Sequence, residues 1–126
     1  RKAITLKPDY LKAIYGRGIC KAFLKDYKGS ISDFTKVIAL DKNYSQAYYN
    51  RAISNAILKN HKDAIPDYDM AINADPKNPE IYYNRGISKM NVQDTNGGCE
   101  DFRKALELGY QPAEQMINIY CPKTSN

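Results

Sequence analysis

Apolar residues recur along this chain at the spacing of one side of an α-helix, in blocks separated by short polar stretches. The first block carries its apolar and aromatic residues at Ile14, Tyr15, Ile19, Ala22 and Phe23, and the second at Ile31, Phe34 and Ile38. The pattern predicts two amphipathic helices joined by a turn at Lys25-Asp26, since Asp suits a turn or a helix N-cap.

This two-helix pattern returns with a period of 34 residues, in rows that begin at Leu11, Ser45 and Pro79. Four columns are identical in all rows: Tyr15, Tyr49 and Tyr83; Arg17, Arg51 and Arg85; Ile19, Ile53 and Ile87; Asp33, Asp67 and Asp101. A fifth column is always aromatic, at Phe34, Tyr68 and Phe102. Small residues recur at Gly18, Ala52 and Gly86 and at Ser30, Ala64 and Gly98, which predicts a close crossing of the paired helices there.

This 34-residue helix-turn-helix pattern resembles the tetratricopeptide repeat family. The second row carries the resemblance most fully, with A-Y-Y-N-R-A at 47–52, Ala64-Ile65, Tyr68, Ala71-Ile72 and Asp75-Pro76. The resemblance implies an all-α, right-handed superhelix, or solenoid, of three repeats closed by a capping helix. The third row departs most from the family pattern, with Gly97-Gly98-Cys99 where an Ala-Ile pair is usual. Its end also resembles the closing unit of a bacterial subgroup, with a Cys early in the second helix and a final Tyr-Cys.

The register divides the chain into six segments. They are a remnant second helix of a preceding repeat at 1–8, repeats at 9–44, 45–78 and 79–111, a capping helix at 112–122 and a polar tail at 123–126. The first segment follows from Arg1 to Leu6, which share the register of Thr35 to Leu40. This places the chain at the carboxyl-terminal end of a longer array, with self-association expected at its truncated amino-terminal end.

In the family, first helices line a concave groove, and the resemblance assigns groove positions to this chain. They are Lys12, Tyr15 and Ile19; Gln46, Tyr49, Asn50 and Ile53; and Glu80, Tyr83, Asn84 and Ile87. Tyr offers rigid contact area and Asn pairs with peptide N–H and C=O groups, so the groove suits an extended peptide. The alternative is that Tyr49 and Tyr83 mainly pack against the neighbouring unit.

Some relatives hold acidic carboxyl-terminal tails of chaperones in a clamp of Lys, Asn and Arg. Asn50 alone matches that clamp, because Tyr15, Ile19, Glu80 and Asn84 occupy its other places. We therefore do not expect a chaperone-tail clamp.

The Arg and Asp columns run in step, one on each helix of the pair. One interpretation is an anion site built from Arg17, Arg51 and Arg85. The other, which we favour, is a structural ladder of ion pairs with Asp33, Asp67 and Asp101, since matched opposite charges in every unit suit bidentate pairing.

The three cysteines are too few for a disulfide scaffold and are not spaced as a metal site. Cys99 lies on a second helix and Cys121 on the helix that follows, so the two are able to approach. A disulfide and two buried thiols both remain open, and Cys20 has no candidate partner.

Composition adds few constraints on function. The net charge of +5 over 126 residues is scattered, with no Lys/Arg run longer than two, so nucleic-acid binding is the weakest hypothesis. No catalytic arrangement, metal site or cofactor motif is visible, and the single His61 occupies the column of Tyr27, which favours a packing role. No membrane segment or signal is apparent, and the compartment is left open.

The leading hypothesis is a non-enzymatic module that binds a peptide or protein partner in the groove. A structural scaffold that self-associates through its repeat ends is the alternative.

Overall fold

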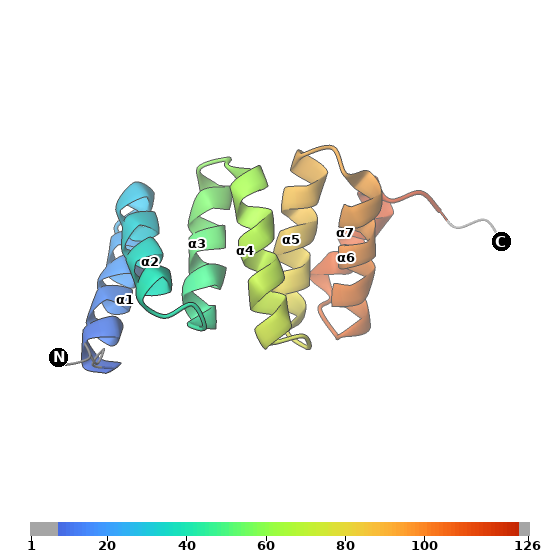
Figure 1. Cartoon of the computed structure of the whole chain (residues 1–126). Coiled ribbons are helices and arrows are strands. Elements are labelled where there is room, and N and C mark those ends of the chain that lie inside the picture. The colour runs from blue at the N-terminus through green and yellow to red at the C-terminus, as the bar shows by residue number, and fades with distance from the viewer. Residues whose placement is uncertain (1–7, 124–126) are drawn as a thin grey trace.

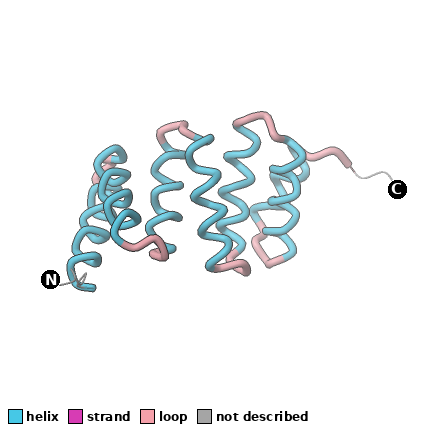
Figure 2. The backbone as a smooth tube through the Cα atoms, in the orientation of Figure 1, coloured by secondary structure: helices cyan, strands magenta, loops and turns pink. Residues whose placement is uncertain are grey.

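The computed structural model describes residues 8–123, over which it contains seven helices and no strand (Figure 1). The helices are α1 (Pro8–Phe23), α2 (Tyr27–Leu40), α3 (Ser45–Ile57), α4 (His61–Ala74), α5 (Pro79–Asn91), α6 (Thr95–Glu107) and α7 (Pro112–Tyr120). They pack as three antiparallel pairs, α1 with α2, α3 with α4 and α5 with α6, and α7 packs on α6. Figure 2 shows every connection at one of the two edges of this row of helices. The protein is thus an all-α superhelix of stacked helix pairs.

The turns inside the three pairs share one backbone geometry. Each first helix is followed by a residue with positive φ: Lys25 at 67°, Lys59 at 71° and Gln93 at 72°. At the first turn Asp26 N donates to Lys21 O at 2.7 Å and Lys25 N to Ala22 O at 2.9 Å, which is the hydrogen-bond pattern of a Schellman motif. These bonds satisfy carbonyls that the helix end would otherwise leave open.

A side chain caps the N-terminus of the second helix in the first and third repeats but not in the second. Asp26 accepts a hydrogen bond from Gly29 N and caps α2, and Asp94 accepts one from Gly97 N and caps α6. Asn60 occupies the same position before α4 but makes no side-chain cap. At the start of α4 the equivalent amide, Asp63 N, instead donates to the backbone carbonyl of Asn60 at 3.2 Å, so only α2 and α6 have a side-chain cap.

The small-residue columns meet at the crossing of the paired helices, as the sequence predicts. A Cβ added to Gly18 would lie 2.7 Å from the Phe34 ring, and one added to Gly86 would lie 2.9 Å from the Phe102 ring. Both rings are fully buried. Glycine is thus needed at these two positions because an aromatic ring fills the space that a side chain would take.

Two segment boundaries differ from the prediction, and parts of two segments lie outside the described residues. Pro8, assigned to the remnant helix, instead opens α1, where proline is tolerated because a first-turn amide needs no partner in the helix. The rest of that remnant, residues 1–7, lies outside the described residues, as do 124–126 of the tail. The capping helix ends at Tyr120 and not at 122, with Cys121 as its C-cap.

Candidate functional site

Hydrogen bonds on the first helices join each repeat to the next. Asn50 Nδ2 donates to the Tyr15 hydroxyl at 2.7 Å and to the Gln46 carbonyl at 3.0 Å. One repeat further on, Asn84 Nδ2 donates to the Tyr49 hydroxyl at 3.0 Å. The tyrosine and asparagine columns therefore form pairs that cross from α1 to α3 and from α3 to α5.

The tyrosine rings themselves pack into the protein. Tyr15 lies 5.7 Å from Phe34 between ring centroids, Tyr49 lies 6.1 Å from Tyr68, and Tyr83 lies 5.0 Å from Tyr110. Burial raises the pKa of the Tyr15 and Tyr49 hydroxyls, while the asparagine bonds to them act in the opposite direction. The rings thus contribute to packing, as the alternative interpretation held for Tyr49 and Tyr83, and the three tyrosines are only partly buried.

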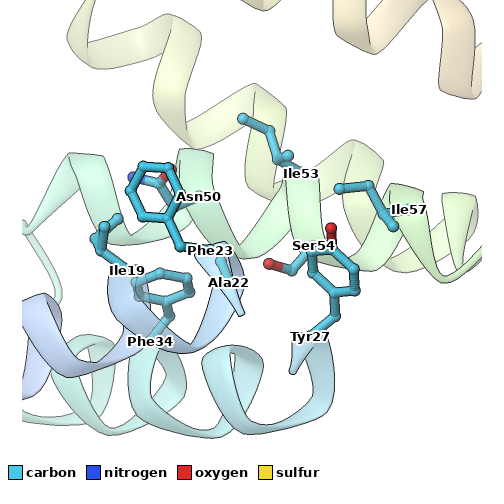
Figure 3. Close-up of a pocket in the computed structure, with 9 residues that line it drawn as sticks. All are labelled: Ile19, Ala22, Phe23, Tyr27, Phe34, Asn50, Ile53, Ser54 and Ile57. Carbon is cyan, nitrogen blue, oxygen red and sulfur yellow. The ribbon is translucent and has the colours of Figure 1, made fainter. Parts of the chain in front are cut away.

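An apolar pocket of about 310 Å³ lies between the first two repeats (Figure 3). Its lining residues come from the ends of α1 and α3 and from α2: Ile19, Ala22, Phe23, Tyr27, Phe34, Asn50, Ile53, Ser54 and Ile57. Phe23 is 83% exposed and Ile57 is 46% exposed, although both are large and apolar. An isolated apolar residue at the surface is ordinary, whereas several gathered around one hollow indicate a binding surface.

A second hollow of about 380 Å³ adjoins the first through Asn50, which lines both, and we call it the polar hollow. Its lining comprises Tyr15, Ser45, Gln46, Tyr49, Asn50, Ala71, Ala74, Asp75, Asn78 and Ile81. The turn after α4 supplies the Asp75 carboxylate and the Asn78 amide, and the hydroxyl groups of the hollow come from α1 and α3. The two hollows together offer an apolar and a polar subsite side by side.

The structure places the predicted groove residues in three settings. Ile19, Asn50 and Ile53 line the apolar pocket, and Tyr15, Gln46, Tyr49 and Asn50 line the polar hollow. Lys12, Glu80, Tyr83, Asn84 and Ile87 line neither hollow: Lys12 and Glu80 are exposed, Asn84 bonds Tyr49, and Tyr83 and Ile87 pack on the third core cluster. The sequence analysis did not assign Tyr27 and Ser54 to the groove, although both line the apolar pocket. For Tyr27 the signal was the predicted turn at Lys25-Asp26, because such a turn places the start of α2 beside the end of α1.

Each arginine of the repeated column holds the aspartate of its own repeat through two hydrogen bonds. The Nε and Nη2 atoms bond the two carboxylate oxygens at 2.9 and 2.8 Å in Arg17–Asp33, 2.7 and 2.9 Å in Arg51–Asp67, and 2.9 and 2.8 Å in Arg85–Asp101. The Arg17 bond holds the pKa of Asp33 below its ordinary value despite burial. Because these donors already serve a carboxylate, the arrangement favours a structural ladder over an anion site.

Cys99 and Cys121 are joined by a disulfide, with their Cα atoms 5.7 Å apart. Both are buried among Phe102, Ala105 and Ala113. The bond links α6 to the end of α7. Cys20, on α1, is a free and exposed thiol.

His61 Nδ1 and Ser88 Oγ lie 2.9 Å apart in a hydrogen bond between the second and third repeats. Burial, and then the charge of Lys59, lower the pKa of His61. Among residues 8–123, no group of three or more His, Cys, Asp or Glu side chains is placed to hold a metal ion. No helix in the described region has the length and apolar character required to span a membrane.

A family model described as tetratricopeptide repeat matches residues 45–78. No curated protein matches the sequence. Among solved structures, the first TPR of Spaghetti (RPAP3) bound to the HSP90 peptide SRMEEVD is 19% identical, with a TM-score of 0.77 over 92% of this chain and 99% of that one. PcrH from Pseudomonas aeruginosa is 16% identical, with a TM-score of 0.84 over 94% and 96% of the two chains.

The Arabidopsis OM64 TPR domain is 24% identical, with a TM-score of 0.79 over 86% of this chain and 94% of that domain. At these identities the structures establish the fold. The family model covers the second repeat, and the helix pairs on either side of it carry the same columns and the same turn geometry. The repeat over residues 45–78 is therefore a tetratricopeptide repeat, and the protein folds as a tetratricopeptide-repeat array.

Proposed function

We propose that this chain is a non-enzymatic protein-interaction module, which binds an extended segment of a partner protein across the apolar pocket and the polar hollow. The observation that carries the proposal is the position of the Tyr15–Asn50 pair between an apolar and a polar subsite. Two similar folds have been solved with peptide or protein ligands. Spaghetti carries an HSP90 peptide, and PcrH carries the chaperone binding region of PopD.

The Tyr15–Asn50 pair has the chemistry to bind a peptide backbone. Both Nδ2 hydrogens of Asn50 are used, by the Tyr15 hydroxyl and the Gln46 carbonyl, which leaves Oδ1 to accept a bond. The Tyr15 oxygen accepts from Asn50, so its own proton is able to donate. The pair therefore presents one acceptor and one donor, which complement the N–H and C=O of one residue of an extended chain.

The apolar pocket supplies the anchor for a side chain. Figure 3 shows Ile19 and Phe23 of α1 on one side of the hollow and Ile53 and Ile57 of α3 on the other. Burial of a Leu, Ile, Phe or Met side chain contributes about 1.5–3 kcal/mol. We therefore expect the ligand to carry a large apolar residue at the position that enters this pocket.

An acidic carboxyl-terminal tail is not the expected ligand. In the family's clamp for such tails, cationic side chains hold the carboxylates, and this chain has Tyr15, Glu80 and Asn84 at those places. The groups that line the two hollows are instead hydroxyls, amides, apolar surface and one carboxylate, that of Asp75, which would repel an acidic tail. Backbone pairing and an apolar anchor thus replace the recognition of carboxylates.

Selection of random 12-residue peptides on the immobilised chain, followed by calorimetry of the enriched sequences, tests the proposal. We expect enriched peptides with one large apolar residue, and at least about tenfold weaker binding to Ile57→Asp, because a carboxylate would be buried in the pocket. Asn50→Ala should weaken binding as well. Lys36→Ala, on α2 outside both hollows, is the matched control and should bind normally.

Two results would contradict peptide binding across the apolar pocket and the polar hollow. One is enrichment of peptides that bind Ile57→Asp and Asn50→Ala as tightly as the unaltered chain. The other is enrichment of acidic peptides without an apolar residue.

A further inference from the structure

The polar hollow has a negatively charged lining, although the chain as a whole has a net charge of +5. Over residues 8–123, Asp75 is the one charged side chain in this lining, and no Lys or Arg belongs to it. Asp41, the counterpart of Asp75 in the first repeat, accepts a hydrogen bond from Asn43 N at 3.0 Å. Within the same range no hydrogen bond or ion pair to the exposed Asp75 carboxylate is found, so its oxygens are open to a ligand.

The C-terminus of α4 adds to this negative potential. The helix ends at Ala74, which lines the hollow, and Asp75 is its C-cap. Among residues 8–123, no backbone amide donates to the carbonyls of Asn73 and Ala74. Aligned peptide dipoles place about half a negative charge at such a helix end. The end of α4 and the Asp75 carboxylate therefore favour a cation at the same place.

A second carboxylate, that of Glu80, acts on the hollow from α5. Glu80 lies in the first turn of that helix and is exposed. Burial raises the pKa of Tyr49, which lines the hollow, and the charge of Glu80 raises it further. Lys12 is the cation of the same groove column, but no ion pair joins it to either carboxylate in the described part of the chain.

The separation of the two hollows along α3 sets the spacing of the ligand's side chains. The apolar pocket takes Asn50, Ile53, Ser54 and Ile57 from α3, and the polar hollow takes Ser45, Gln46, Tyr49 and Asn50. The midpoints of these two sets lie about six residues apart, which is about 9 Å along the helix. In a polyproline II conformation, residues three positions apart point to the same side and lie about 9 Å from each other.

We propose that the ligand of this groove is a basic extended segment, in which a large apolar residue enters the apolar pocket and a Lys or Arg three positions away pairs with Asp75 in the polar hollow. This specificity rests on the peptide-binding function proposed above and names its class of ligand. The backbone between the two side chains passes the Tyr15–Asn50 pair, which lies between the hollows. Opposite charge selects the basic residue, and the distance between the hollows sets its position.

Parallel selections of random 12-residue peptides on the unaltered chain and on Asp75→Lys test the charge preference. The unaltered chain should enrich peptides with Lys or Arg three positions from a large apolar residue. Asp75→Lys should lose this basic residue and enrich Asp or Glu in its place, because the charge in the hollow is reversed. Glu100→Lys makes the same change of net charge at an exposed position of α6 and should still enrich the basic residue.

A double-mutant cycle tests the contact itself. The most enriched peptide and its variant with Gln in place of the basic residue are titrated by calorimetry into the unaltered chain and into Asp75→Asn. Each single change should weaken binding about three- to tenfold, and the two together should weaken it little further. Asp75→Asn keeps the size of the side chain and removes no hydrogen bond found among residues 8–123, so the fold should be retained, which circular dichroism checks.

The outcomes separate this specificity from peptide binding as such. Enriched peptides that carry the apolar residue, lack Lys and Arg, and are weakened by Ile57→Asp would overturn the basic class and leave the binding function standing. Strictly additive effects in the cycle, or the same basic preference on Asp75→Lys, would overturn the pairing with Asp75. Absence of any enriched peptide would overturn both proposals.

Discussion

The Tyr15 hydroxyl accepts a hydrogen bond from Asn50 Nδ2 at 2.7 Å, although 35 residues separate the two along the chain. The bond runs from α3 to α1 and so joins the first helices of two neighbouring repeats. The equivalent bond, Asn84 to Tyr49, joins the next two. No corresponding bond from Asn118 to Tyr83 exists in the described structure, so the ladder stops before the capping helix.

Asn50→Ala should lower the free energy of unfolding by about 0.5–1.5 kcal/mol, the usual contribution of an intramolecular hydrogen bond. It should also raise the pKa of Tyr15 further, because the lost bond acts against the effect of burial. Urea unfolding and ultraviolet titration of tyrosinate measure the two effects. Asn118→Ala, which removes no side-chain hydrogen bond found among residues 8–123, is the control, and an equal loss in both variants would contradict the assigned role.

Asp33→Asn should destabilise the protein at neutral pH, because the buried Asp33 carboxylate would lose its two charge-assisted hydrogen bonds from the half-exposed Arg17 and its ion pair with Lys21. The pKa of Asp33 is lowered by the Arg17 bond, so the folded state binds this proton less readily than the unfolded chain. The stabilisation is thus present above the unfolded pKa of 3.8 and is lost as pH falls through the lower folded value.

Urea unfolding of the Asp33→Asn variant between pH 7 and pH 2 measures this dependence. The difference from the unaltered chain should shrink toward the acid end. A difference that stays constant with pH would show that the pair contributes through packing and not through charge.

Asp26→Ala should cost about 1 kcal/mol of unfolding free energy, because the Gly29 amide loses its acceptor at the start of α2. Asn60→Ala, at the same position before α4, should cost clearly less, since Asn60 caps nothing. Thermal unfolding of the two variants compares them directly. Equal losses would show that the residue acts in the turn and not as a cap.

Lys59→Gly should stabilise the protein by up to about 1 kcal/mol, because Lys59 holds φ at 71°, where a Cβ is unfavourable and glycine is not. Lys36→Gly makes the same replacement inside α2 and should cost about 1 kcal/mol. The opposite signs in urea unfolding separate backbone strain from loss of the lysine. Destabilisation by both variants would overturn the expectation.

Reduction of the Cys99–Cys121 disulfide should lower stability by about 3 kcal/mol for a loop of this length. The effect should be concentrated in α7, because a helix of nine residues is not stable by itself. Hydrogen exchange with and without reductant should show amides 113–121 losing protection while those of α1 to α4 keep theirs. The double variant Cys99→Ala, Cys121→Ala should exchange as the reduced protein does, and protection of α7 in that variant would contradict the role of the bond.

Much of the architecture could be predicted from the sequence because its signals are local or periodic. Helical spacing of apolar residues defines each helix, and the 34-residue period defines the pairs. The columns of glycine and of aromatic residues predicted the crossing, since Gly18 leaves the space that Phe34 fills. Arg17 and Asp33 could be matched because the same two columns occur in every row.

The candidate site could be predicted only in part. Tyr15 and Asn50 were both assigned to the groove, but their mutual bond depends on how far one repeat rotates against the next, which no local pattern encodes. Tyr27 and Ser54 enter the apolar pocket for the same reason, because a turn and two helices converge there. The four groove assignments in the third repeat, Glu80, Tyr83, Asn84 and Ile87, rested on the repeat alone. The two hollows form instead between the first two repeats and beside α4.

The sequence by itself thus determined the elements, their pairing and the repeated contacts inside each pair, because these follow from periodicity and from residues that recur together. The tertiary structure decided which half of the Tyr–Asn column faces a hollow and that Cys99 and Cys121 are bonded. These depend on the distances and angles between neighbouring helix pairs. Small changes in that packing move side chains by more than a hydrogen-bond length without changing any sequence pattern.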